Sequence, residues 1–333
     1  MGISRVTELL IPTSQRLSAQ ELHDSLDLGA GDVGRKRSAF LIMLVLSGVI
    51  AITGVLADST ATVIGAMIIA PLATPILGIG LGIVVGQLRL VLTSLAWVMI
   101  GLAIVVFIGA ISARFVADPT TLAVNSQVTG RTSPGLLDLA AALATGTAGA
   151  FAIARRDLSA VLPGVAIAIS LVPPLAVVGV CAGVGAWDSA LGALWLFLSN
   201  VVALIIASSI VLTIAGYAKD PASLPTAKRR RAYTVVGVAA AVVIIPLALN
   251  TAVSVAIASW GLTIRDTTQT WIGDGTDVRM TGLSWVGVNA TVDLVSDDGQ
   301  IPSTDELTDA LETLPEFVSV DLRVQNEALY PVR

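Results

Sequence analysis

Two sets of prolines, carboxylates and hydroxyls recur at matching places in two apolar segments of the sequence. A proline removes a backbone donor and clashes with the preceding helical turn, so it frees carbonyl oxygens inside an apolar helix. Such carbonyls, with hydroxyls beside them, can ligate a cation or hydrogen-bond a small polar solute. The candidate residues of a substrate-or-ion pathway are therefore Asp58, Pro71, Thr74, Pro75, Asp157, Ser170, Pro173, Pro174 and Asn200.

Each of these residues also has a purely structural interpretation. Asp58 and Asp157 stand where helices begin, so they either cap free N–H groups or form an entry site for a cation. Arg155 and Arg156 beside Asp157 favour a local ion pair. Asn200 either holds helices together or meets the solute. The prolines either line a pathway or only kink and pack their helices.

The sequence offers no set of side chains for catalysis. His23 is the only histidine, which excludes a Ser–His pair in the membrane, and Cys181 is the only cysteine, so no disulfide forms within the chain. Glycine-rich phosphate loops and metal-ligand spacings are absent from the sequence. We expect no catalytic residues, no metal and no cofactor, and we expect that the protein is not an enzyme.

Composition indicates an integral membrane protein. Hydrophobic residues make up 55% of the 333 residues and charged residues only 13%, whereas soluble domains carry roughly 25% charged residues. About 20 apolar residues are needed to cross a bilayer as a helix. Seven stretches meet this length, and they are Ala39–Ala57, Ala61–Val85, Leu90–Ala113, Leu136–Ala154, Leu158–Val184, Ala190–Tyr217 and Thr234–Ser259.

The basic residues of the short loops indicate the orientation. The segments that would share one side with the N-terminus hold eleven Lys and Arg residues, which are Arg35, Lys36, Arg37, Arg89, Arg155, Arg156, Lys219, Lys228, Arg229, Arg230 and Arg231. The loops of the opposite side hold Arg114 and Arg131. Because basic loops stay in the cytoplasm, we expect the N-terminus inside and the C-terminus outside.

An internal repeat relates the two proline-bearing segments. The segment from Asp58 and the segment from Asp157 are offset by 157 − 58 = 99 positions, and nine of 29 aligned residues are identical. Three helices separate equivalent positions, so the two copies would have opposite orientations in the membrane. We therefore expect a 3+3 inverted repeat of residues 38–113 and 136–217, a plan that recurs in secondary transporters.

Three stretches of sequence carry a resemblance to a known family. They are the run from Val63 to Leu72 followed by Pro75, the run Ala144-Thr145-Gly146, and the run from Gly164 to Leu175, with Leu196 to Asn200 in addition. On these residues the chain resembles the prokaryotic membrane proteins of the domain of unknown function 389 family. The resemblance covers about residues 40–214 and implies this membrane fold, but it implies no substrate.

Both ends of the chain are more polar than its centre. In residues 1–37, which we expect in the cytoplasm, Ser18 and Glu21 have the spacing of a capping box that begins a helix. In residues 260–333, thirteen Asp and Glu face four Arg. Alternating apolar residues at 286–294 and 318–324 flank a second capping box at Ser303, so a strand, a helix to about Leu314 and a strand are expected.

The sequence thus predicts an all-α polytopic membrane protein with about seven transmembrane helices and a small C-terminal α+β soluble domain. Its transmembrane domain is residues 38–259, in which 234–259 is an extra helix after the two repeats. We expect a transporter or channel-like permease for an unidentified small solute or ion. The alternative is a non-transporting envelope scaffold or sensor. The expected partners are the lipid bilayer of a prokaryotic cytoplasmic membrane, the solute and further copies of the chain, and not nucleic acid.

Overall fold

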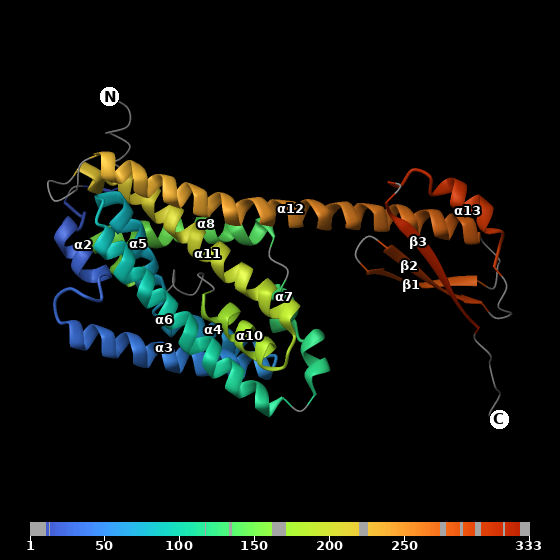
Figure 1. Cartoon of the computed structure of the whole chain (residues 1–333), viewed down its shortest axis with the longest axis horizontal. Helices are drawn as coiled ribbons and strands as arrows, with labels where there is room; N and C mark the ends of the chain where they lie inside the picture. Colours follow the sequence, from blue (N-terminus) through green and yellow to red (C-terminus); the bar gives the residue numbers. More distant parts are fainter. Residues whose placement is uncertain are drawn as a thin grey trace. The chain divides into compact units, whose positions relative to one another are not determined.

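The computed structural model of the chain forms two compact units, Met1–Ala248 and Leu249–Arg333. The boundary falls within the long helix α12 (Thr226–Ile272), which is drawn as one continuous element in Figure 1. The residues that the structure describes are 11–12, 14–116, 118–132, 135–161, 171–219, 226–273, 278–286, 289–296, 301–315 and 317–326.

A short helix precedes the first apolar helix, as the capping-box spacing predicts. Helix α2 (Ala19–Leu26) begins after Ser18, whose hydroxyl accepts a hydrogen bond from the Glu21 N–H at 3.2 Å. In return the Glu21 carboxylate accepts from the Ser18 N–H at 2.9 Å. Leu22 and Leu26 are buried against the apolar helices, so α2 is packed onto the helices of its own unit.

Apolar helices and short connecting helices build the rest of the first unit. The apolar helices are α3 (Val33–Leu56), α4 (Thr60–Ile69), α5 (Ala73–Val85), α6 (Leu88–Ser112), α8 (Leu136–Ala154), α10 (Val172–Gly183) and α11 (Trp187–Ile214). The connecting helices are η1 (Ala113–Phe115), η2 (Pro119–Ala123), α7 (Ser126–Thr132), η3 (Arg156–Val161) and η4 (Tyr217–Lys219).

Within the described residues, four helices are long and apolar enough to cross a membrane, namely α3, α6, α8 and α11. Helices α4 and α5 meet at a bend of 49° and together make a fifth candidate span. Large apolar side chains point outward from these helices, and Phe107 of α6 is 66% exposed. Such a surface suits lipid, because water would not favour so much exposed apolar area.

The predicted spans agree with these five candidates within a few residues. The largest shift is in α3, which begins six residues before the predicted Ala39 because Asp32 caps it by accepting from the Arg35 N–H. The predicted fifth span includes residues 162–170, which lie outside the described residues. The predicted seventh span lies within α12, where the structure describes the helix but not most of the side chains between 235 and 251.

The buried core of the first unit surrounds α10. All ten residues from Val172 to Cys181 are buried. Helix α10 packs against α3, α6 and α11, while α5 packs against α6 and α11 (Figure 1). The shorter helices α5 and α10, called the half-helices below, therefore lie among longer ones. Both of them begin in the interior of the unit.

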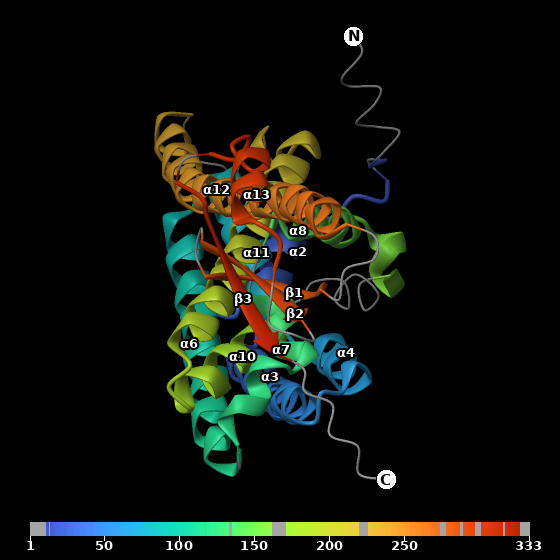
Figure 2. The same cartoon turned by 90° about the vertical axis from the view of Figure 1, so that its right-hand side faces the viewer.

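The second unit packs the end of α12 against a three-stranded sheet. The strands β1 (Val278–Val286), β2 (Asn289–Ser296) and β3 (Ser319–Asn326) lie in the order β1-β2-β3 (Figure 1). Figure 2 shows the same strands from the right-hand side of Figure 1. Strand β2 pairs antiparallel with β1 and parallel with β3. Helix α13 (Thr304–Ala310) connects β2 to β3 in the sequence. Ile264 and Ile272 of α12 join the buried side chains of β2 in one cluster.

The α+β character predicted for the tail is confirmed, with two differences. The alternating residues Ala290, Val292 and Leu294 are buried on one face of β2, as predicted. Strand β1 was not predicted, because a register shift between Met280 and Gly282 interrupts the alternation of side chains that identifies a strand. Helix α13 ends at Ala310 and is four residues shorter than predicted.

Candidate functional site

The first proline pair lies at the break between α4 and α5. Helix α4 ends at Ile69, and Pro71 lies in the break, where it has no N–H to continue the helix. The Thr74 N–H donates to the Pro71 carbonyl at 3.3 Å. Pro75 is buried in the first turn of α5, a position that tolerates proline because its N–H would have no helical partner. The two prolines therefore end one helix and begin the next.

The second proline pair begins α10. Pro173 and Pro174 lie in its first turn and are buried. Like Pro75, they occupy the part of a helix that has no need of their missing N–H groups. Ser170, the hydroxyl expected beside them, lies outside the described residues.

The two half-helices are followed by turns of the same construction, 99 positions apart. The Gln87 N–H donates to the Gly82 carbonyl at 2.8 Å, and the Ala186 N–H donates to the Cys181 carbonyl at 2.8 Å. Gly86 and Gly185, at φ of 76° and 83°, are the left-handed residues of these turns. The turns join α5 to α6 and α10 to α11, so both half-helices fold back along a long helix.

The helix pair α5 and α6 contacts the helix pair α10 and α11 at equivalent positions, which are called the exchanged contacts below. A methyl group added to Gly80 of α5 would meet the side chain of Ser208 on α11, with the two Cβ atoms 3.0 Å apart. A methyl group added to Gly179 of α10 would lie 2.8 Å from the Cα of Gly109 on α6. Gly179 follows Gly80 by 99 positions, and Ser208 follows Gly109 by 99. Each half-helix thus touches the long helix of the other pair at the equivalent point.

The same contacts give the directions of the half-helices. The nearest atoms to Gly179 belong to Val106 and Gly109, and those to Gly183 belong to Ala110 and Ala113. Residue numbers therefore increase in the same direction along both helices, which means that α10 runs parallel to α6. Helix α5 runs antiparallel to α6, because the tight turn folds it back. Helices α5 and α10 therefore run in opposite directions.

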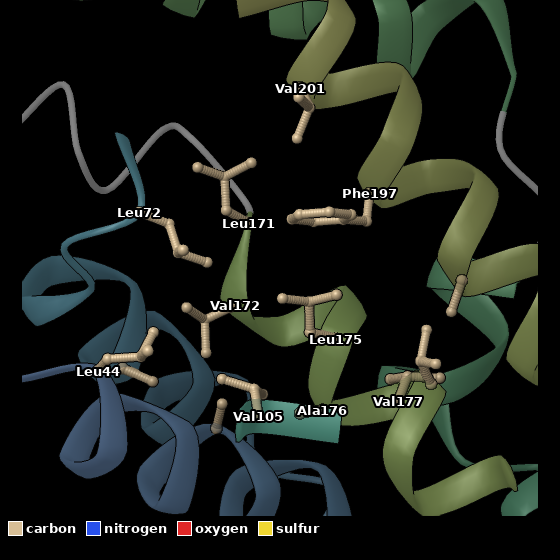
Figure 3. Close-up of a cluster of buried hydrophobic side chains, with 14 of the residues drawn as sticks. Leu44, Leu72, Val105, Leu171, Val172, Leu175, Ala176, Val177, Phe197 and Val201 are labelled. Atoms are coloured by element: carbon tan, nitrogen blue, oxygen red, sulfur yellow. The ribbon is translucent and has the colours of Figure 1, made fainter. Parts of the chain in front are cut away.

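Leucines occupy the starts of both half-helices. Leu72 and Leu171 are the residues immediately before α5 and α10, and neither start is capped by a side chain. They are 0% and 2% exposed and belong to one buried cluster with Val172, Leu175 and Phe197 (Figure 3). Sequence reasoning singled out the polar neighbours and missed these leucines, although they also match at the offset of 99.

Asn200 lies on α11 beside this cluster. It is 6% exposed and stands between Phe197 and Val201, which are both in the cluster. Its equivalent in the first half is Gly101, where an added methyl group would lie 2.5 Å from the Leu72 side chain. The second half thus carries an amide where the first half carries no side chain.

Asp58 binds the connecting segment between the two halves. Its carboxylate accepts from the Ser126 hydroxyl at 2.6 Å and from the Gln127 N–H at 3.2 Å. The Ser126 bond is the main cause that lowers the pKa of Asp58 below its usual range. Capping of its own helix was one interpretation, but Ser59 caps α4 instead, and Asp58 holds the start of α7.

Asp157 forms the local ion pair that its neighbours indicate. Its carboxylate lies 2.6 Å from an Arg155 guanidinium nitrogen, and this hydrogen bond is the main cause of its lowered pKa. Arg156 reaches back to Glu21 of α2, at 2.6 Å. Asp58 and Asp157 thus both hold polar corners of the first unit together.

In the part of the chain that the structure describes, no group of three or more His, Cys, Asp and Glu side chains is arranged to hold a metal ion. Among the described residues, Asp58 and Asp157 are each bonded to neighbours at their own corner. The starts of the half-helices lie in a buried apolar cluster with Asn200 beside it. This cluster is the candidate site.

Comparison with known proteins finds similarity in the central part of the chain. Residues 67–206 match the model of the family described as Domain of unknown function (DUF389). The chain is 32% identical over 202 residues to Uncharacterized protein MJ0678 of Methanocaldococcus jannaschii, and the match spans 61% of either chain. No solved structure matches the chain significantly.

Proposed function

We propose that the protein is a transporter or channel-like permease, from the geometry of the region that matches the DUF389 model, residues 67–206. Its cargo would be a small solute or ion whose identity the residues do not specify. The observation that carries this proposal is the pair of half-helices that begin at buried Leu72 and Leu171 and run in opposite directions. Half-helices that start inside a bilayer are a recurring device of transporters.

We propose further that the two halves are a 3+3 inverted repeat. The hydrogen bonds of the two turns, the exchanged glycine contacts and the opposite directions of α5 and α10 all support it. They recur at one offset of 99 positions, from Gly80 and Gly179 to Gly109 and Ser208. A two-fold relation between oppositely oriented halves is what allows one site to face either side of a membrane in turn.

The proposed topology has seven spans, with α10 and the residues before it as the fifth and part of α12 as the seventh. The N-terminus lies in the cytoplasm and the C-terminal unit outside, in a prokaryotic cytoplasmic membrane. The basic loops support this orientation. Equivalent exposed turn residues also differ in sign, since Arg89 follows α5 and Asp188 follows α10.

In the proposed mechanism the apolar cluster is the closed state of the pathway. A constriction of leucines, valines and Phe197 excludes water and hence polar solutes until it opens. Thr74 and Asn200 are then the polar groups beside the opening, and Ser170, outside the described residues, is proposed for the same role from the sequence alone. The prolines leave carbonyls at the end of α4 without helical donors, and these are the proposed partners of the solute.

A catalytic role is not part of the proposal. Asp58 and Asp157 are engaged at separate corners by Ser126 and Arg155, and His23 is the single histidine of the chain. Lipid is the proposed partner of the exposed apolar helices. Further copies of the chain are proposed partners of the small C-terminal unit, because a unit of about 85 residues has a limited core of its own.

A second candidate function rests on α12. This helix carries an apolar stretch and then contributes Ile264 and Ile272 to the core of the sheet unit. A helix shared in this way can transmit a binding event at the sheet to the membrane. The chain would then be an envelope scaffold or sensor whose outer unit binds a partner.

The two functions differ in whether water reaches the half-helix starts. We would replace Cys181 by Ala and introduce single cysteines as Thr74→Cys and Ser170→Cys. Membrane-impermeant maleimide is then added to right-side-out and inside-out vesicles. Transport predicts labelling at both positions, because a solute pathway must be hydrated when it opens.

Phe107→Cys is the matched negative control, since this position is exposed on the lipid-facing side of α6. Labelling of neither Thr74→Cys nor Ser170→Cys, in protein that elutes as a folded species, would contradict transport. The scaffold or sensor function would then be the better account.

A further inference from the structure

The segment that precedes each half of the first unit is bonded to the opposite half. Ahead of α3, the Leu17 N–H donates to the Ala154 carbonyl at 3.0 Å, and the Arg156 N–H donates to the Gln15 carbonyl at 2.9 Å. The Arg156 guanidinium also pairs with Glu21 at 2.6 Å. These contacts fasten the N-terminal segment to the end of α8, and they are called the α8 latch below.

A second set of contacts fastens the segment ahead of α8 to the end of α3. The Asn125 side-chain amide donates to the Val55 carbonyl at 2.9 Å, and the Ser126 hydroxyl donates to Asp58 at 2.6 Å. The Gln127 side-chain amide donates to the Thr60 hydroxyl at 2.8 Å. These contacts form the α3 latch.

The latches occupy equivalent places. The carbonyls that accept the bonds belong to Val55 and Ala154, which are 99 positions apart. The aspartates that follow, Asp58 and Asp157, are 99 positions apart as well. Each latch therefore ties the lead-in segment of one half to the corner where the other half turns from its first helix into its second.

Each latch also carries a short helix that packs on a half-helix. Helix α2 packs on α5, where Leu22 and Leu26 share a buried cluster with Leu77 and Leu81. Helix α7 packs on α10 and α11, and Val128 of α7 is buried in the central cluster. Because α5 and α10 leave the centre in opposite directions, α2 and α7 cover the routes to opposite faces.

We propose that the two latches are the two gates of the pathway. Release of the α8 latch lets α2 leave α5 and opens the centre to the cytoplasm. Release of the α3 latch lets α7 leave α10 and opens the centre to the outside. This inference rests on the proposed transport function and adds how each side of the pathway is closed.

The chemistry of the latches suits reversible release. The Arg156 and Glu21 side chains are 52% and 43% exposed, and an ion pair open to water is weak because solvent screens it. The Asp58 carboxylate accepts from the Ser126 hydroxyl and the Gln127 N–H, and both donors are uncharged. Neither latch contains a buried charge pair that would lock the gate.

The test measures the labelling rate of Thr74→Cys, in the Cys181→Ala background, from each side of vesicles holding the full chain. Arg156→Glu places a like charge beside Glu21, and its matched control Arg156→Lys keeps the positive charge. Ser126→Asp places a like charge beside Asp58, and its matched control Ser126→Thr keeps the hydroxyl. Substitution at either position leaves the half-helices unchanged.

We expect Arg156→Glu to speed labelling from the cytoplasmic side by about fivefold, the change that an exposed charge pair can produce, with little change from outside. Ser126→Asp should do the same from the outside only. The controls should label at the parent rate. Adding Glu21→Arg to Arg156→Glu restores the pair with reversed charges and should return the rate to that of the parent.

Two outcomes overturn the inference, and they are distinguishable. If Thr74→Cys is labelled at rates that the latch variants do not change, the latches are only structural and the transport proposal stands. If it is unlabelled in every variant and from both sides, there is no hydrated pathway, and both proposals are wrong.

Discussion

The two halves of the first unit share backbone geometry but not side-chain chemistry. Both have a half-helix, a glycine turn and a long helix at one offset of 99 positions, and both make the same exchanged contacts. They differ at the corners, where one latch uses an ion pair and the other a carboxylate and a hydroxyl. They differ again beside the buried cluster, where Asn200 in the second half is equivalent to Gly101 in the first. The two halves are therefore alike at the turns and at the close glycine contacts, and unlike in the side chains of the corners and the centre.

Among variants that compare the two halves, replacement of Leu72 or Leu171 should change the free energy of unfolding most. Leu72→Ala and Leu171→Ala each leave a cavity in the same buried cluster, so each should lower the free energy of unfolding by about 2–5 kcal/mol. Leu92→Ala, at a side chain that is 55% exposed, is the control and should change it little. Denaturant unfolding in detergent measures the difference. A large effect in only one half would break the equivalence.

The exchanged glycine contacts should give the next largest effect. Gly179→Ala would meet backbone atoms of Val106 and Gly109, which cannot rotate away, and should cost about 1–3 kcal/mol. Gly80→Ala meets the Ser208 side chain instead and should cost less, and adding Ser208→Gly should recover the loss. Gly65→Ala, which enters open space, is the control. The same unfolding measurement tests all four variants, and a failure of Ser208→Gly to rescue would argue against direct contact.

The glycines of the two turns should have smaller and equal effects. Gly86→Ala and Gly185→Ala each force a side chain into a left-handed conformation, at a cost of about 1–2 kcal/mol. Equal shifts in thermal unfolding are expected, because the hydrogen bonds of the two turns match. Shifts that differ by more than the cost itself would mean that the two turns are not equivalent.

The smallest effect concerns the carboxylate at one corner. Since the Ser126 hydroxyl lowers the pKa of Asp58, the carboxylate stabilises the fold above the unfolded-state pKa of about 3.9. This contribution is lost as pH falls through the lower folded-state pKa. Asp58→Asn tolerates the φ of 48° at this position, so the difference in melting temperature should be constant from pH 7 to pH 5 and shrink near pH 3. A difference that changes between pH 8 and pH 6 would indicate another group.

Much of the fold could be predicted from hydrophobicity and spacing alone. The capping box at Ser18, the apolar helices and the buried face of β2 each follow from a local pattern of residues. The ion pair of Asp157 with Arg155 also follows from sequence proximity. These features depend on neighbours along the chain, which a sequence displays directly.

The features that sequence reasoning missed depend on contacts between distant residues. Asp58 is bonded to Ser126, 68 positions away, and Arg156 to Glu21, 135 positions away. Leu72 and Leu171 look like ordinary apolar residues until the fold brings them into one cluster. The offset of 99 was visible in the sequence, but only the contacts of Gly80 and Gly179 give it a spatial meaning.

The transport proposal and the two gates both require that the halves face opposite ways in the membrane. The most direct test uses Arg89 and Asp188, which are equivalent, exposed and adjacent to the two matched turns. Arg89→Cys and Asp188→Cys, each in the Cys181→Ala background, are treated with impermeant maleimide in vesicles of both orientations. We predict that Arg89→Cys reacts only from the cytoplasmic side and Asp188→Cys only from the outside. Reaction of both from the same side would contradict the inverted arrangement.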